Sequence, residues 1–157
     1  MKIKLIVIGK TTDANLIQLE EMYKNRLKFY IPFEVTVIPE LKNTKSLSMA
    51  EQKEKEADLL LKVLDGNDEV ILLDERGKQF TSMEFSSFLD KKQLANHKCV
   101  VFIVGGAYGF SERIYSRANG LISLSKMTFS HQMIRIFFIE QLYRAMTIQK
   151  GEPYHHE

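Results

Sequence analysis

Residues 99–104, Cys-Val-Val-Phe-Ile-Val, form an uninterrupted apolar run that continues directly into Gly105-Gly106-Ala107-Tyr108-Gly109. A short apolar run that ends in glycines is typical of a strand buried on both faces of a sheet. Four similar runs are stopped by a glycine, a proline or polar residues, and they cover residues 3–8, 33–38, 70–73 and 121–124. The sequence therefore predicts about five strands, the third of which ends at Leu73, before Asp74-Glu75-Arg76-Gly77.

Between these runs, apolar residues recur at steps of three and four, which is the period of an amphipathic helix. Ser48 and Thr81 each precede a glutamate by three residues and so predict capping boxes, and Ser111 and Ser130 are further candidate caps. The predicted helices cover residues 16–30, 48–64, 81–95, 111–119 and 130–149. This alternation predicts a three-layer α/β/α fold with a mostly parallel sheet, in a single domain 1–157 with a short tail, 151–157.

The composition is that of an ordinary globular domain, with 157 residues, 45% hydrophobic and 27% charged. It excludes a disordered tail protein, a collagen-like repeat and a coiled-coil rod. A single cysteine, with neither a secretory signal nor a membrane-spanning run, predicts a cytoplasmic protein without a membrane partner. The net charge is +2, and residues 97–157 hold 7 basic against 4 acidic side chains, which favours an anionic partner for this part of the chain.

The common phosphate-binding and metal-binding motifs are absent from the sequence, which has no G-x-G-x-x-G, no G-x-x-x-x-G-K-[ST] and no zinc-spaced cysteines or histidines. Ligands of open α/β sheets bind beyond the carboxyl ends of the strands, so the loops after Leu73, Val104 and Leu124 are the candidate site. Glycines allow a ligand to approach the backbone closely, and residues 124–130 mix apolar side chains with hydroxyls. We expect a ligand pocket without a metal.

The predicted last helix, 130–149, is apolar around nearly its whole circumference. A helix of this kind must be buried on every side, and we expect a second copy of the chain to cover it in an isologous homodimer. Arg144 lies among apolar residues of this helix and needs a partner. His131 falls in its first turn, and Tyr154, His155 and His156 in the tail suit stacking on bases and contacts to phosphates.

Four blocks in this order, Val104–Gly109, Leu124–Met133, Glu140–Ala145 and Pro153–His155, resemble the RlmH family of ribosomal RNA large subunit methyltransferases, which belong to the SPOUT class. The resemblance extends over the whole chain. It implies an S-adenosylmethionine-dependent enzyme that methylates N3 of a pseudouridine in the 23S ribosomal RNA of assembled ribosomes. It also implies a homodimer and a trefoil knot in the C-terminal part of the chain.

The resemblance further implies which residues contact S-adenosylmethionine: Leu73, Gly105, Gly106, Leu124, Ser125, Lys126, Met127, Thr128 and Phe129. The acceptor nitrogen carries a proton that must leave before it attacks the methyl group. We hypothesise that Arg144 stabilises the resulting anion, that His155 or His131 accepts the proton, and that Tyr154 positions the base. Arg144, Tyr154, His155 and His156 are the expected RNA contacts, and one subunit is expected to lend its tail to the cofactor loops of the other.

Two other functions remain open at this point. One is a SPOUT-class methyltransferase that acts on transfer RNA, which would methylate naked transfer RNA. The other is a non-catalytic ribosome-associated binding protein, which would not bind S-adenosylmethionine.

Overall fold

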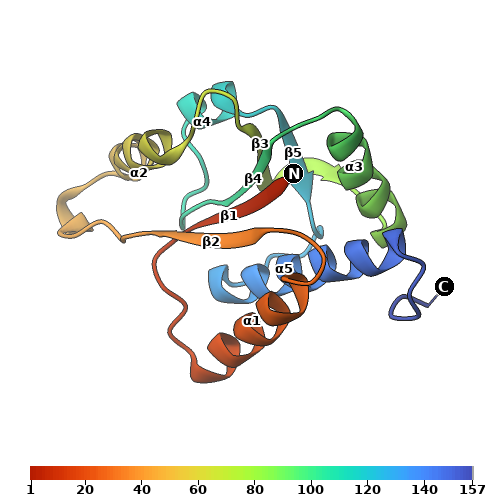
Figure 1. Ribbon diagram of the computed structural model, residues 1–157. Helices are drawn as coiled ribbons and strands as arrows, with labels where there is room; N and C mark the ends of the chain where they lie inside the picture. The colour runs from red at the N-terminus through yellow and green to blue at the C-terminus, as the bar shows by residue number, and fades with distance from the viewer. Residues whose placement is uncertain (157) are drawn as a thin grey trace.

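The computed structural model of the protein describes residues 1–156 (Figure 1). Within them, five strands form one sheet in the order β2-β1-β4-β3-β5, and every neighbouring pair is parallel. The strands are β1 (Lys2–Ile8), β2 (Phe33–Ile38), β3 (Glu69–Gln79), β4 (Cys99–Val104) and β5 (Gly120–Ser123). The helices are α1 (Ala14–Leu27), the short 3-10 helix η1 (Thr44–Ser46), α2 (Met49–Val63), α3 (Ser82–Leu94), α4 (Glu112–Arg117) and α5 (His131–Gln149).

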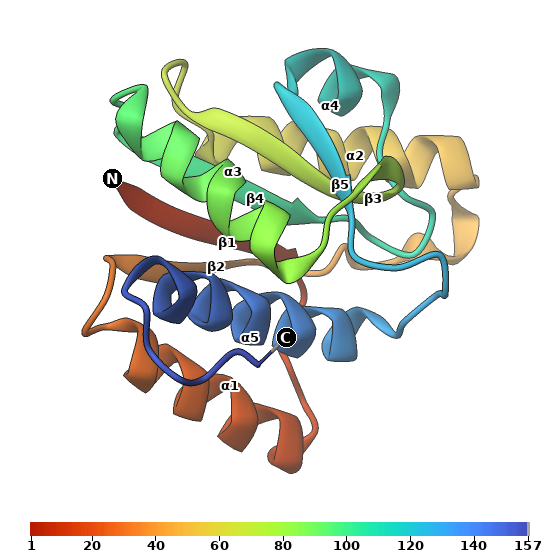
Figure 2. The ribbon, with the colours of Figure 1, turned by 90° about the vertical axis from the view of Figure 1, so that its right-hand side faces the viewer.

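The predicted three-layer α/β/α architecture is confirmed. Helices α1, α3 and α5 cover one face of the sheet, and α2 and α4 cover the other (Figures 1 and 2). Successive strand residues point to opposite faces, so that Phe102 packs under α3 and α5, while Val101 and Ile103 pack under α2 and α4. This burial on both faces is why the strands are solid apolar runs in the sequence. The trefoil knot stays a prediction of the resemblance.

The helix starts follow the predicted caps with two exceptions. Thr81 forms a complete capping box with Glu84 at the start of α3, and the Ser130 hydroxyl accepts a hydrogen bond from the backbone N–H of Met133 in α5. Ser48 accepts from the backbone N–H of Glu51, which is one half of the predicted box. Ser111 is at the predicted N-cap position of α4, but its side chain makes no capping hydrogen bond. None of the helices in residues 1–156 is long and apolar enough to cross a bilayer.

Strand β3 is longer than the sequence predicts. It continues from Leu73 through the polar residues to Gln79, and its pairing with β5 shifts so that Leu73 and Lys78 both lie opposite Ile122. Gly77 makes this bulge possible, because a Cβ atom at this position would lie 2.5 Å from the backbone nitrogen of Ile122. The prediction failed because backbone pairing at the edge of a sheet does not require apolar side chains.

Helix α5 lies between α1 and α3 on the same face of the sheet (Figure 2). Its buried residues are Arg135, Ile136, Phe138, Ile139, Leu142, Ala145, Met146 and Thr147. Helices α1 and α3 of the same chain therefore cover part of the surface of α5 for which we expected a second copy. Phe137 remains 40% exposed. The homodimer itself stays a prediction.

Arg135 is a buried cation that attaches α5 to the end of β1. Its side chain is 3% exposed and donates hydrogen bonds to the backbone oxygens of Ile8 (2.8 Å) and Gly9 (2.9 Å) and to the hydroxyl of Thr11 (3.1 Å). Burial lowers the pKa of this guanidinium. These bonds satisfy carbonyls that the end of β1 would otherwise leave unpaired inside the fold.

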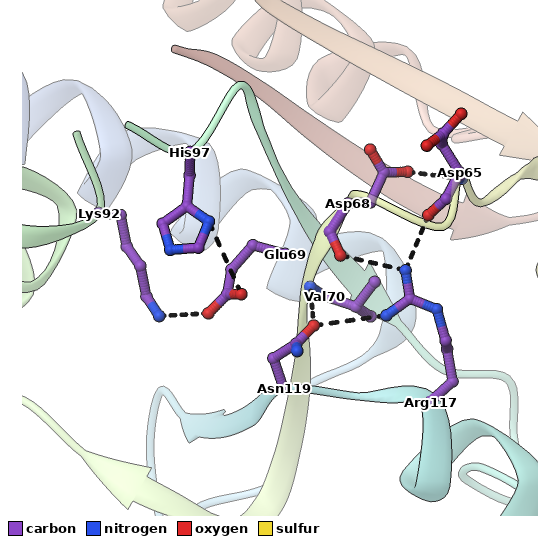
Figure 3. Close-up of polar contacts among 8 residues, drawn as sticks. All are labelled: Asp65, Asp68, Glu69, Val70, Lys92, His97, Arg117 and Asn119. Atoms are coloured by element: carbon purple, nitrogen blue, oxygen red, sulfur yellow. Dashed lines mark hydrogen bonds and ion pairs between the residues drawn. The ribbon is translucent and has the colours of Figure 1, made fainter. Parts of the chain in front are cut away.

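A polar network holds the amino end of β3 beside β5 (Figure 3). The Arg117 guanidinium, at the end of α4, donates to the backbone oxygens of Asp65 (2.8 Å) and Asp68 (3.0 Å). The Asn119 side-chain oxygen accepts from the backbone N–H of Val70 at 2.8 Å. The network thereby sets the register of β3 against β5, and with it the position of the loops at the opposite ends of these strands.

The amino end of β3 is also connected to α3 by an ion pair (Figure 3). Glu69, at the start of β3, pairs with Lys92 of α3, and the Nδ1 atom of His97 lies 3.8 Å from its carboxylate. Both ends of the α3–β4 connection are thus anchored to the first residue of β3. All these contacts lie at the amino end of β3, and the loops of the candidate site lie at the other end of the strands.

Candidate functional site

A cleft of about 500 Å³ opens at the carboxyl ends of β3, β4 and β5. These three strands are neighbours and run in the same direction, so the three loops that follow them meet at one edge of the sheet. Leu73, inside the observed β3 where the sequence predicted the strand to end, lines the cleft together with Gly105 after β4 and Leu124 after β5. The sequence-based expectation that these loops come together is confirmed.

The glycine loop after β4 forms one wall of this cleft. The backbone N–H of Gly109 donates to the oxygen of Gly106 at 3.1 Å, and Gly109 has a positive φ of 79°, which favours glycine. Gly106 is confined from behind, since a Cβ atom there would lie 2.5 Å from the Oε1 atom of Glu56. Glycine at residue 106 fits against Glu56 on the inner side of the loop. On the other side, the loop presents bare backbone to a ligand.

Glu56 is a functional candidate that sequence reasoning missed. Its side chain is 6% exposed, and its Oε1 atom has no hydrogen-bond partner within residues 1–156. Burial raises the pKa of this carboxyl, against a smaller opposing effect from a hydrogen bond with Gln52. Its place on the buried stripe of α2, beside Ala57 and Leu60, was the available signal.

The loop from β5 to α5 forms the opposite wall. The Ser123 hydroxyl donates to the backbone oxygen of Ser125 (2.9 Å), and the Ser125 hydroxyl accepts from the backbone N–H of Met127 (2.9 Å). Phe129 packs against Phe137 with ring centroids 4.8 Å apart. The wall is thus apolar in its side chains and polar in its backbone, as a pocket for a flat, partly polar ligand requires.

Eight of the nine expected cofactor residues line this one cleft: Leu73, Gly105, Gly106, Leu124, Ser125, Met127, Thr128 and Phe129. Lys126 belongs to the same loop and is exposed, but it does not line the cleft. His131, at the first turn of α5, is exposed and does line it.

Among the polar residues that line the cleft, Asp74, Arg76 and Tyr115 form one group to which sequence reasoning had assigned no role. The Tyr115 hydroxyl donates a hydrogen bond to the Asp74 carboxylate, and the Arg76 guanidinium lies 5.2 Å from the centre of the Tyr115 ring. Burial, followed by the hydrogen bond to Asp74, raises the pKa of Tyr115 to about 12. Tyr115 therefore remains a hydrogen-bond donor at neutral pH.

A second cluster gathers at the other end of α5. Arg144 donates to the Oε1 atom of Glu140 at 2.6 Å, and its Nη1 atom lies 3.3 Å from Nδ1 of His155. The Tyr154 hydroxyl donates to the same Glu140 oxygen at 2.9 Å, and the Arg144 guanidinium lies 4.7 Å from the centre of the Tyr154 ring. Burial, and then hydrogen bonds with Tyr23 and Glu140, raise the pKa of Tyr154. Arg144, Tyr154 and His155 thus meet as expected, while His156 is exposed on the tail.

The cleft and this cluster are far apart within one chain. His131 and Arg144 are separated by 13 residues of continuous helix, a rise of about 20 Å at 1.5 Å per residue. The two histidines proposed as alternative bases therefore belong to different places. In residues 1–156, no three or more histidine, cysteine, aspartate or glutamate side chains are grouped so that they could hold a metal ion.

Comparison with known proteins identifies the family of the chain. Residues 1–155 match a protein family described as "Predicted SPOUT methyltransferase". The chain is 62% identical to the ribosomal RNA large subunit methyltransferase H of Parabacteroides distasonis, 56% to that of Flavobacterium johnsoniae and 55% to that of Bacteroides thetaiotaomicron. Each alignment covers 157 residues and 100% of both chains. The chain therefore belongs to the SPOUT methyltransferases and, among them, to the family of ribosomal RNA large subunit methyltransferase H.

Proposed function

We propose that the protein is a methyltransferase that uses S-adenosylmethionine to methylate N3 of a pseudouridine in 23S ribosomal RNA. It acts in the cytoplasm, on assembled ribosomes and as a homodimer. The observation that carries the proposal is the cleft at the carboxyl ends of β3, β4 and β5, in a chain that matches ribosomal RNA large subunit methyltransferase H over its full length. The finer details, the methyl donor and the modified nitrogen, rest on the family resemblance.

The residues of the cleft fit this methyl donor. The volume of the cleft, about 500 Å³, lies within the usual range for small-molecule sites. Gly105 and Gly106 expose backbone to the ligand, while residues 124–129 supply apolar contacts and backbone polar groups. Bound there, S-adenosylmethionine supplies an electrophilic methyl group. The protein's task is to hold the acceptor nitrogen in line with that group, at about 3–3.5 Å.

The Arg144 cluster fits the acceptor. When the N3 proton leaves, negative charge develops on the imide, and the Arg144 guanidinium can stabilise it by donating hydrogen bonds. Glu140 holds this guanidinium in place at 2.6 Å. Tyr154, with its raised pKa, remains protonated and donates its one hydroxyl proton to Glu140, so that its ring and hydroxyl oxygen position the base. His155 accepts the N3 proton, with His131 as the alternative acceptor in the cleft.

The separation of about 20 Å along α5 favours a site shared between two subunits. In-line transfer requires the acceptor cluster and the methyl donor to be in contact, which one chain does not achieve. A second copy can bring its tail to the cleft. Next to the cleft, an apolar depression of about 340 Å³, which includes Phe80, Phe129 and the exposed Phe137, offers a surface for that copy.

Mixing two inactive variants tests both the activity and the shared site. Ribosomes from cells that lack the protein are incubated with tritiated S-adenosylmethionine, and the modified base is then mapped. Arg144→Ala should be inactive alone, and so should Gly106→Leu, whose side chain would collide with Glu56 and displace the glycine wall of the cleft. Mixed dimers should regain transfer, because one of their two sites combines an intact cleft with an intact cluster. Recovery would not occur if each chain held a whole site.

Deletion of residues 152–157 provides a second test. None of the described residues 152–156 lines the cleft, so calorimetry should find S-adenosylmethionine affinity unchanged while methyl transfer is lost. Methylation of naked transfer RNA in place of ribosomes would favour the transfer RNA enzyme. Absence of S-adenosylmethionine binding by the intact protein would favour the non-catalytic binding protein.

A further inference from the structure

Phe29 is an unusually exposed aromatic residue directly after α1. Its side chain is 74% exposed and stands between two shallow depressions, one bordered by Arg26 and Tyr143 and the other by Ile31 and Phe33. An apolar ring of this size gains free energy when a flat partner covers it. The ring is therefore a candidate contact for a ligand outside the cleft and the Arg144 cluster.

Cations and aromatic rings alternate around Phe29. The Lys28 ammonium lies 5.3 Å from the centre of the Phe29 ring, and the Lys150 ammonium lies 5.0 Å from the centre of the Tyr30 ring. The Arg26 guanidinium lies 5.5 Å from the centre of the Tyr143 ring. We call this surface the aromatic track, and it consists of Arg26, Lys28, Phe29, Tyr30, Tyr143 and Lys150.

The cations of the track are not neutralised. In the part of the chain that the structure describes, no carboxylate lies within 4 Å of Arg26, Lys28 or Lys150. Of the two nearby acids, Glu21 pairs with Lys24 at 2.9 Å, while Glu152 accepts a hydrogen bond from Tyr30 and keeps its negative charge, which leaves the three cations in excess. The track therefore presents positive charge that is available to an anionic partner.

The track is continuous with the Arg144 cluster. The ring centroid of Tyr143 lies 5.7 Å from that of Tyr30 and 4.7 Å from that of Tyr154, whose ring lies under the Arg144 guanidinium. A chain of contacts thus leads from Phe29, at the end of α1, to the residues proposed to hold the acceptor base. A polymer whose target base lies at Arg144 can therefore reach this surface with its neighbouring nucleotides.

We propose that the aromatic track binds single-stranded RNA next to the methylated nucleotide, with a base stacked on Phe29 and phosphates on Lys28, Arg26 and Lys150. This inference rests on the proposed function, because it places the RNA by the Arg144 cluster. Bare cations interleaved with exposed rings fit the alternating phosphates and bases of a single strand. A protein partner would leave the charge of Lys28 and Lys150 unmatched unless it were acidic.

Two pairs of matched variants test the track. The test variant Lys28→Glu/Lys150→Glu reverses two charges of the track. Its control, Lys55→Glu/Lys62→Glu, makes the same change on α2, on the opposite face of the sheet. Both control lysines are exposed and unpaired within residues 1–156. Phe29→Ala removes the ring, and Leu94→Ala truncates a side chain that is also 74% exposed, at the end of α3. Each protein is titrated with a short uridine oligonucleotide and assayed for ribosome methylation, and its mass in solution is measured.

The charge reversal on the track should raise the Kd for the oligonucleotide and the KM for ribosomes about tenfold, with kcat little changed. It should also make binding less sensitive to salt. The slope of log binding constant against log salt concentration should become shallower by about 1.4, for two lost phosphate contacts. Phe29→Ala should weaken oligonucleotide binding about fivefold or more. The two control variants should match the wild type.

Equal oligonucleotide binding by the track and control variants would overturn the proposal. A change of molecular mass in the track variants alone would also overturn it, by identifying the surface as a contact between protein subunits. These arms are separate from the proposed function. If the wild type binds the oligonucleotide through the track yet methylates no ribosomes, the activity is wrong and the RNA surface stands.

Discussion

Gly77→Ala is the sharpest test of how β3 and β5 shape the cleft. A Cβ atom at residue 77 would lie 2.5 Å from both the backbone nitrogen and the carbonyl carbon of Ile122, and 2.7 Å from its Cα atom. Backbone atoms of a paired strand cannot move aside as a flexible side chain can. Overpacking of a tight site costs about 1–3 kcal/mol, and we expect the upper end, about 3 kcal/mol, because backbone receives the clash.

Gly66→Ala is the matched control. It is the same substitution in the turn before β3, where an added Cβ atom would meet nothing within 4 Å and φ is not positive. There we expect no loss, and a gain of up to about 1 kcal/mol from the reduced freedom of the unfolded chain. Urea unfolding followed by circular dichroism measures both variants.

The same substitution at residue 77 has a functional consequence. Ile122 is followed by Ser123 and Leu124 in the wall of the cleft, so displacement of β5 also displaces that wall. Calorimetry should show S-adenosylmethionine affinity falling about tenfold or more in Gly77→Ala, equivalent to about 1.4 kcal/mol. Unfolding midpoints and affinities that coincide for the two variants would refute the close approach of β3 to β5.

Three further predictions concern single buried or hydrogen-bonded groups. Burial raises the pKa of Glu56, so the folded state retains a proton that the unfolded state has lost, and the wild type should lose stability as pH rises from the ordinary carboxyl pKa to the raised one. Glu56→Gln cannot ionise, and its urea midpoint relative to the wild type should therefore be higher near neutral pH than in acid; a pH-independent difference would contradict this. Arg135→Met leaves two backbone carbonyls without their donor and should lower the free energy of unfolding, measured in urea, by about 3 kcal/mol. The control Arg113→Met, which removes an exposed ion pair, should not show this loss. Tyr154→Phe should lower kcat of methyl transfer but keep its dependence on pH, because a tyrosine with a raised pKa is not the base, whereas His155→Gln should remove the acidic limb of the profile.

The local pattern of the sequence was sufficient for most of the architecture. Runs such as residues 99–104 are apolar on every residue because both faces of the sheet are covered, and the Thr81 capping box marks the start of α3 by contacts within one turn. These signals depend only on residues close together in the chain. The glycine loop after β4 and the loop after β5 could likewise be selected, because parallel strands bring the loops at their carboxyl ends to the same edge.

The roles within the site required tertiary information. The sequence placed His131 and His155 as alternatives for one task, but α5 separates them by about 20 Å in a single chain. Arg144 was expected to need a partner, and Glu140, one helical turn earlier, provides it while also holding Tyr154. The spacing of Glu140 and Arg144 along the helix is visible in the sequence. That Tyr154 shares Glu140 with Arg144 depends on where the tail folds back, and helical periodicity does not encode that position.

The sequence by itself determined the strands, the helices, the loops that form the cleft and the family. Only the tertiary structure decided that β3 continues past Leu73 through a bulge at Gly77, that Glu56 is buried against Gly106, and that α1 and α3 cover the sides of α5. Secondary structure follows from hydrogen bonds and burial patterns between near neighbours in the chain. Contacts such as that between Glu56 and Gly106 join residues 50 positions apart, and they are set by the packing of whole helices on the sheet.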